Sequence, residues 1–189
     1  MIKHPEQRVG VLVDVSNMYH SAKHLFSRKV NFKEILTQAV ANRKLIRATA
    51  YVIHTEGEEE TAFFDALTQQ GFEVKMKDLQ IFSDGSKKGD WDVGIAVDAI
   101  KLSEKLDVIV IVSGDGDYLP LMEYLQNSKG CLVEVMAFRK TCSSQLVEQS
   151  DDFIDLAADR KFLIYSRTKF ADSPKDSVGK TDMNNRLKK

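Results

Sequence analysis

Short apolar runs alternate along the chain with longer segments in which apolar residues recur every three or four positions. The short runs, rich in Val, Ile and Leu, predict β-strands at residues 8–14, 45–53, 72–76, 107–112 and 132–138. Residues 153–156 have the composition of one more short strand. The longer segments predict helices at residues 16–26, 32–41, 58–70, 91–105, 118–128 and 143–149. Asn31 is placed to cap the second helix, and Gly71 and Gly130 to end the third and fifth.

The alternation of strands and helices indicates the fold class. Parallel strands joined by right-handed helical crossovers, with helices on both faces of the sheet, are the usual outcome of such a pattern. We therefore predict a Rossmann-like α/β fold with about five strands in the order 3-2-1-4-5. This order places the first strand beside the fourth, at the switch point where such folds bind ligands.

Composition favours one domain followed by a polar tail. The chain has 189 residues, 43% of them hydrophobic, which is enough for one substantial core. We expect a single domain over residues 1–166 and a disordered tail over residues 167–189. The tail holds seven Lys and Arg against three Asp and Glu, which leaves 20 against 25 in the body. A body with this charge is not a general polyanion-binding surface.

Cysteine content and hydropathy indicate in which cellular compartment the protein is expected. There are two cysteines, Cys131 and Cys142, which is typical of a reducing environment. The first residues are not followed by a long apolar segment, so we expect no secretory signal. The apolar runs are far shorter than the roughly 20 residues that cross a bilayer. We expect a cytoplasmic protein that does not enter a membrane.

Acidic residues lie where two of the predicted strands end. Asp14 closes the first strand, and Asp115 and Asp117 follow the fourth strand within Ser-Gly-Asp-Gly-Asp. If these strands are neighbours, their carboxylates converge at one edge of the sheet. The helix before the fourth strand offers Asp92 in its first turn and Asp98 six positions later, and six steps of about 100° separate the two by roughly 120°. Asp92, nearer the loop, is the better candidate.

A cluster of carboxylates points to a bound cation. Unpaired anions in one cleft repel each other, and a hard divalent ion such as Mg²⁺ or Mn²⁺ relieves that repulsion through oxygen ligands. Such an ion binds phosphate and activates water for attack. Asn17 is placed to hold a substrate phosphate or the attacking water, and Ser113 to orient a carboxylate. Lys87 and Lys88 can contact a nucleic-acid backbone, because contacts with phosphate groups do not depend on the base sequence.

Two other interpretations of these residues stay open. An Asp after a strand often serves only as a helix cap or turn residue, which applies to Asp14 as well as to Asp115. The Gly-Asp-Gly loop also resembles that of haloacid-dehalogenase phosphatases. Those enzymes need a second Asp two residues after the nucleophilic one, and here Ser16 occupies that position.

Three segments in order resemble the NYN domain of the PIN-like nuclease superfamily, in its LabA-type (DUF88) branch. They read Asp14-Val15-Ser16-Asn17, Lys88-Gly89-Asp90-Trp91-Asp92 leading into Ala96-Val97-Asp98, and Ser113-Gly114-Asp115-Gly116-Asp117-Tyr118 followed by Pro120-Leu121. The resemblance covers residues 8–156. It implies a PIN-like, Rossmann-like fold, metal-dependent ribonuclease activity, and acidic ligands at Asp14, Asp92, Asp115 and Asp117. Asp98 also matches a recurring family position and is a second-rank candidate.

Two hypotheses from different classes follow. The first is a ribonuclease that uses Mg²⁺ or Mn²⁺ in an acidic cleft, with RNA as its partner. The second is a regulatory module that keeps the fold, binds RNA or protein, and turns over little or nothing. Retention of all the acidic positions favours the enzyme, whereas the acidic body favours the module. A protein partner or a homodimer is compatible with both hypotheses.

Overall fold

The fold is organised around one parallel sheet, as a computed structural model shows for residues 3–54, 58–81 and 87–165. For residues 58, 59, 81, 87 and 88 only the backbone is described. The sheet has six strands in the order β4-β3-β1-β7-β8-β9, and every pairing is parallel. The strands are β1 (Arg8–Asp14), β3 (Lys44–His54), β4 (Glu73–Asp78), β7 (Val108–Val112), β8 (Leu132–Ala137) and β9 (Asp152–Asp155).

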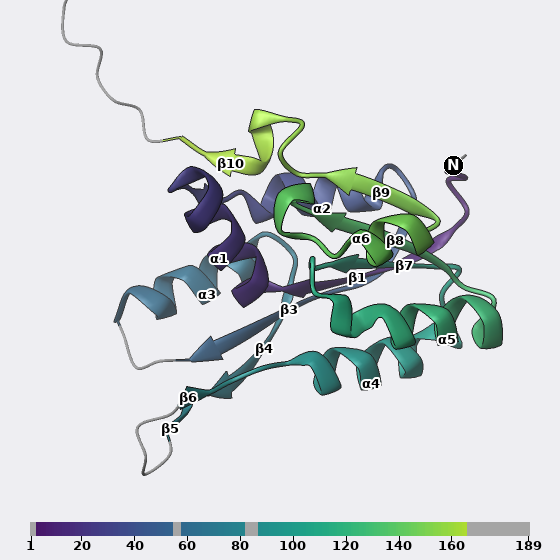
Figure 1. Cartoon of the computed structure of the whole chain (residues 1–189), viewed down its shortest axis with the longest axis horizontal. Coiled ribbons are helices and arrows are strands. Elements are labelled where there is room, and N and C mark those ends of the chain that lie inside the picture. The colour runs from purple at the N-terminus through teal and green to yellow at the C-terminus, as the bar shows by residue number, and fades with distance from the viewer. Residues whose placement is uncertain (1–2, 55–57, 82–86, 166–189) are drawn as a thin grey trace, which may run out of the picture.

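Helices cover both faces of this sheet (Figure 1). α4 and α5 lie on one face, and α1, α2 and α3 lie on the other. The helices are α1 (Val15–Phe26), α2 (Phe32–Val40), α3 (Glu58–Gln69), α4 (Asp92–Ser103), α5 (Leu119–Lys129) and α6 (Ser144–Gln149). Within the described ranges, each helix is too short or too polar to span a lipid bilayer.

The core lies on the two central strands. β7 is buried along its whole length, and so is β1 after its first residue. Met18 and Ile35 from one face and Ile95 and Met122 from the other are at most 1% exposed against these strands. Strands that are buried on both sides need continuous apolar sequence rather than alternation, which is why β7 reads Val-Ile-Val-Ile-Val.

The predicted fold class is confirmed, and so are most element boundaries to within two residues. The five expected strands have the expected order, and residues 152–155 add a sixth strand, β9, beside β8. Asn31 caps α2. Gly71 and Gly130 follow α3 and α5 with φ of +100° and +66°, a conformation that glycine adopts without a Cβ clash.

The structure also contains short elements that were not predicted. β2 (Lys29–Val30) pairs antiparallel with β10 (Leu163–Ile164), and β5 (Gln80–Ile81) with β6 (Lys87–Lys88). Residues 83–90 are polar and contain glycine, a composition that predicts a loop, but Lys87–Lys88 form β6; residues 83–86 lie outside the described residues. The expected disorder of the tail, residues 167–189, also concerns residues outside the described ranges.

Candidate active site

The candidate site lies at the carboxyl edge of the two central strands. β1 ends at Asp14, and its neighbour Val13 pairs in register with Val112, the last residue of β7. The chain then turns into α1 on one side and into the segment 113–118 on the other. The side chains at the ends of both strands therefore meet at the switch point of the sheet.

Asp14 joins the strand to the helix. Its carboxylate caps α1 by accepting a hydrogen bond from the backbone N–H of Asn17 at 3.0 Å. The residue is only 9% exposed. Burial raises the pKa of Asp14 to about 6, and the nearby Asp92 and Asp115 carboxylates raise it further against the lowering effect of the backbone N–H groups. A cap needs no cluster of anions, so the cap interpretation alone does not account for these surroundings.

The segment that follows β7 is held by side-chain hydrogen bonds. Asp115 caps a 3-10 turn, η1 (Gly116–Tyr118), by accepting from the N–H of Asp117 at 3.0 Å. Ser113, which is fully buried, accepts from the N–H of Asp115 at 3.3 Å. The side-chain oxygen of Asn17 accepts from the N–H of Gly114 at 3.1 Å. The first turn of α1 is thereby tied to the acidic segment.

Close contact with the chain around residue 141 also fixes this segment. A Cβ on Gly114 would lie 3.0 Å from both the Cα of Cys142 and the carbonyl oxygen of Thr141. The N–H of Ser143 donates to the carbonyl of Gly114 at 2.9 Å. Glycine is needed at position 114 because two backbones approach each other there. Gly116 begins the 3-10 turn, and its backbone φ is not positive.

Asp92 enters the site from the start of α4. Tyr118, which is 1% exposed, donates its hydroxyl hydrogen bond to Oδ1 of Asp92 at 3.0 Å. The preceding residue, Trp91, donates its indole N–H to the carbonyl of Val52 at 2.8 Å and so anchors the helix start to β3. Partial burial raises the pKa of Asp92, the Tyr118 hydrogen bond lowers it, and the negative charges of Asp115, Asp90 and Asp117 raise it.

Three of the carboxylates converge closely. Asp92, Asp115 and Asp117 each offer an oxygen, and these oxygens lie within 4.8 Å of one another. Among the described residues, Asp14 is not part of this trio, although it lies close enough to the carboxylates of Asp92 and Asp115 for their charges to raise its pKa. The N-termini of α1, α4 and η1 all start at these acids, and their partial positive charges offset some of the repulsion.

This donor set fits a hard divalent cation. All of its ligand atoms are carboxylate oxygens, the donors that Mg²⁺ and Mn²⁺ take. Two oxygens bound to one Mg²⁺ at about 2.1 Å each lie at most about 4.2 Å apart. The observed spread of up to 4.8 Å therefore requires only small side-chain rotations.

The other candidate residues lie elsewhere. Asp98 accepts hydrogen bonds from the Tyr51 hydroxyl at 2.7 Å and the Lys75 ammonium at 2.6 Å, so its carboxylate is engaged above β3 and β4. Although burial raises the pKa of Asp98, these two partners bring it below its usual value. Lys87 and Lys88 form β6, and their side chains lie outside the described part of the chain.

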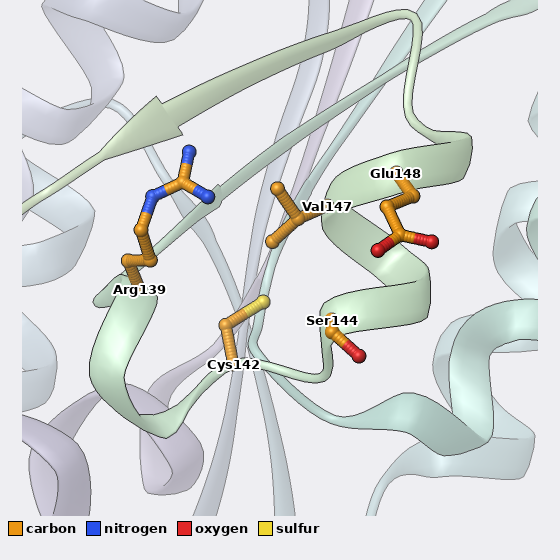
Figure 2. A pocket seen from close by; sticks show the side chains of 5 residues that line it. All are labelled: Arg139, Cys142, Ser144, Val147 and Glu148. Carbon is orange, nitrogen blue, oxygen red and sulfur yellow. The ribbon is translucent and has the colours of Figure 1, made fainter.

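A pocket of about 180 Å³ lies beside Cys142, a residue of the segment that packs against Gly114. Figure 2 shows Arg139 on one side of it and Ser144, Val147 and Glu148 of α6 on the other, with the Cys142 thiol between them. None of the clustered aspartates lines this pocket. Burial raises the pKa of the Cys142 thiol to about 11, so the thiol is un-ionised at neutral pH and is not activated as a nucleophile.

Sequence reasoning missed Tyr118 and the chain around Thr141. Tyr118 directly follows the Gly-Asp-Gly-Asp motif, and a bulky aromatic residue there was the available signal. Its partner Asp92 is 26 residues away, so spacing could not reveal the hydrogen bond.

A parallel α/β sheet with carboxylates gathered at its switch point defines a Rossmann-like domain with an acidic site. The chain belongs to the NYN domain family, whose model matches residues 8–157, and to the LabA-type branch of that PIN-like family. It is 28% identical over 165 residues to the low amplitude and bright protein LabA of Synechococcus elongatus, covering 82% of this chain and 87% of LabA. Among solved structures, a Vibrio parahaemolyticus protein of unknown function superposes with a TM-score of 0.79 at 32% identity, covering 87% of this chain and all of that one.

Proposed function

We propose that this protein is a divalent-metal-dependent ribonuclease that uses Mg²⁺ or Mn²⁺. The observation that carries the proposal is the convergence of the Asp92, Asp115 and Asp117 oxygens within 4.8 Å, beside a buried Asp14. Membership of the NYN family supports RNA as the substrate class. Clustered acids that served only as caps would have no reason to be brought together across three separate elements.

Each residue of the site has a distinct role in this proposal. Asp92, Asp115 and Asp117 hold the metal, and Asp14 completes the anionic wall on the β1 side. A bound divalent ion would neutralise the scissile phosphate and lower the pKa of water for in-line attack. The chain itself must keep the carboxylates in place, because a displacement of about 1 Å in a site of this kind can cost about 100-fold in rate.

Buried polar groups do this positioning. Tyr118 holds Asp92 by the hydroxyl hydrogen bond, and Ser113 holds the backbone of Asp115. The side-chain oxygen of Asn17 accepts a hydrogen bond from Gly114, which supports a positioning role, and in this proposal the side-chain amide nitrogen of Asn17 contacts a substrate phosphate. Partners that fix metal ligands from behind in this way typically change affinity or activity by about 10- to 100-fold when removed.

Cleavage of a labelled RNA tests the proposal. We expect cleavage with Mn²⁺ or Mg²⁺ and none in excess chelator, and we expect Asp92→Asn and Asp115→Asn each to remove most of it, because the ligands of one ion act as a unit. Asp65→Asn, which removes an exposed carboxylate from α3, is the matched control and should cleave like the parent. Full activity in excess chelator, or in Asp115→Asn, would reject the mechanism. Tight RNA binding without any cleavage would support the regulatory module instead.

A further inference from the structure

A group of cationic and aromatic side chains lies at the far end of α1 from the acidic site. Arg28 and Arg160 each place their guanidinium carbon 5.0 Å from the centroid of the Tyr165 ring. We call these three residues the Tyr165 patch. Tyr165 is 40% exposed, and Arg160 is also exposed. The contact joins residues that are more than 130 positions apart, so it is a product of the fold.

The short β2–β10 sheet builds this patch. Lys29 pairs with Ile164 in antiparallel register, and the next step of that register sets Arg28 opposite Tyr165. Buried Phe162 and Leu163 fix the β10 side, and Asn31 bonds to the carbonyl groups of Lys161 and Phe162. The two arginines are therefore held in place by tertiary structure.

The charge of the patch is not neutralised within the described part of the chain. There, neither Arg28 nor Arg160 forms an ion pair with a carboxylate, and each guanidinium group lies against the tyrosine ring. The 19 residues from position 15 to position 33 contain no Asp or Glu, in a body that carries more acidic than basic residues. Two cations held side by side on one ring attract an anion, and two fixed guanidinium groups suit phosphates.

The exposed face of α1 connects the patch with the acidic site. Asn17, which touches the acidic segment, is followed along the helix by exposed His20 and His24. Arg28 lies two residues beyond the end of α1, after the left-handed residue Ser27. Beside this row, exposed Tyr19 lies under the Lys23 ammonium, 5.4 Å from the ring centroid. The twelve residues of α1 span about 18 Å, a length over which a single strand can make several phosphate contacts. Figure 1 shows α1 leading from the end of β1 to the neighbourhood of β10.

We propose that the Tyr165 patch and the exposed face of α1 bind the backbone and bases of single-stranded RNA and guide the strand to the acidic site. The inference rests on the proposed function in taking RNA as the anion. Aromatic rings paired with cations are the elements that hold single strands without sequence preference, through stacking and phosphate contacts. Binding at this surface explains how an acidic body with an acidic cleft acquires a polyanion: the patch supplies the attraction that the cleft lacks.

The test is RNA binding by the full-length chain in excess chelator, where cleavage is blocked. A fluorescent single-stranded RNA of about 12 nucleotides covers a site of this kind. We expect the double variant Arg28→Glu/Arg160→Glu to bind at least about tenfold more weakly at roughly 100 mM salt, and its slope of log affinity against log salt to fall by about 1.4, or 0.7 for each lost phosphate contact. The control Lys101→Glu/Lys105→Glu carries the same charge change at the opposite edge of the sheet and should bind like the parent.

Tyr165 provides a milder test that cannot be explained by misfolding. Tyr165→Phe keeps the ring and should retain parent affinity, whereas Tyr165→Ala should lose about fivefold or more if a base stacks there. Equal affinity of parent, Tyr165→Ala and the Arg28/Arg160 double variant would overturn the inference. The same holds if the double variant loses binding to anionic phospholipid vesicles but not to RNA.

The two proposals fail in different ways. If the parent cleaves RNA with Mn²⁺ while the Arg28/Arg160 variant binds and cleaves unchanged, the Tyr165 patch is wrong and the nuclease stands. If the parent never cleaves RNA but binding is lost only in the patch variants, the nuclease is wrong and the patch stands. Asp115→Asn should abolish cleavage and leave binding in chelator intact or tighter, because it removes one repelling charge.

Discussion

The replacement Asp115→Asn should separate a metal site from a simple helix cap by its effect on stability. Two charges 4.8 Å apart repel by about 1 kcal/mol in water and about 3.5 kcal/mol at an effective dielectric of 20. Asp115 faces both Asp92 and Asp117 at no more than this distance. Asn caps a helical turn as well as Asp does. The metal-free variant should therefore be more stable than the metal-free parent, by about 1 kcal/mol or more.

Metal should reverse this ranking. A cation that binds only the folded parent at about 100 times its dissociation constant adds about 2.7 kcal/mol. In a chain of this size each kcal/mol raises the melting temperature by about 2 to 4 °C, so the parent should gain roughly 5 to 10 °C with Mn²⁺. Asp115→Asn should gain far less, and Asp65→Asn should gain as much as the parent.

Thermal melts of the three proteins, with and without Mn²⁺, are the measurement. The cap interpretation expects a neutral or destabilised Asp115→Asn and an equally small metal effect in all three proteins. That result would refute the metal site.

Two further predictions concern the groups around the cluster. Asp14 has a pKa of about 6 in the folded protein against about 3.9 unfolded, so the folded state retains a proton that the unfolded state has lost. Stability of the metal-free parent should then fall between about pH 4 and 6, by up to about 3 kcal/mol, and urea unfolding of Asp14→Asn should show a flatter profile; identical profiles would contradict the placement of Asp14. Tyr118→Phe removes the hydrogen bond to Asp92 and should weaken Mn²⁺ binding in calorimetry by about tenfold or more. Unchanged affinity would show that Tyr118 only fills space.

The sequence was enough to predict the frame of the site, because that frame depends on local pattern and topology. The apolar run of β7 and the residues before Asp14 predicted two buried strands, and the usual order of doubly wound sheets made them neighbours. A carboxylate that directly follows a strand has little freedom in where it lies, so Asp14 and Asp115 followed from the strand positions. Asp92 followed from helix geometry in the same way.

The features of the site that the sequence did not predict depend on contacts between distant segments of the chain. The hydrogen bond from Tyr118 to Asp92 and the approach of Thr141 to Gly114 arise only when separate crossovers are docked together. Two-residue strands such as β2 and β10 carry no periodicity to detect, and Tyr165 lies in a short apolar run that was assigned to no predicted element. The sequence therefore did not indicate that the three residues of the Tyr165 patch lie close together in the fold.

The acidic centre and the Tyr165 patch together remove the conflict between the two functional hypotheses. An acidic cleft without metal repels RNA, so on this proposal RNA binds under those conditions at the patch, where two arginines form no ion pair with a described carboxylate. A divalent ion held by Asp92, Asp115 and Asp117 would offset most of the negative charge of the cleft and so would let an RNA strand approach it from α1. On this proposal, the protein would bind RNA without cleaving it when metal is scarce and would act as a nuclease when metal is abundant. The salt dependence of RNA affinity, measured with and without Mn²⁺ in Asp14→Asn, should show this as additional phosphate contacts that appear only with metal.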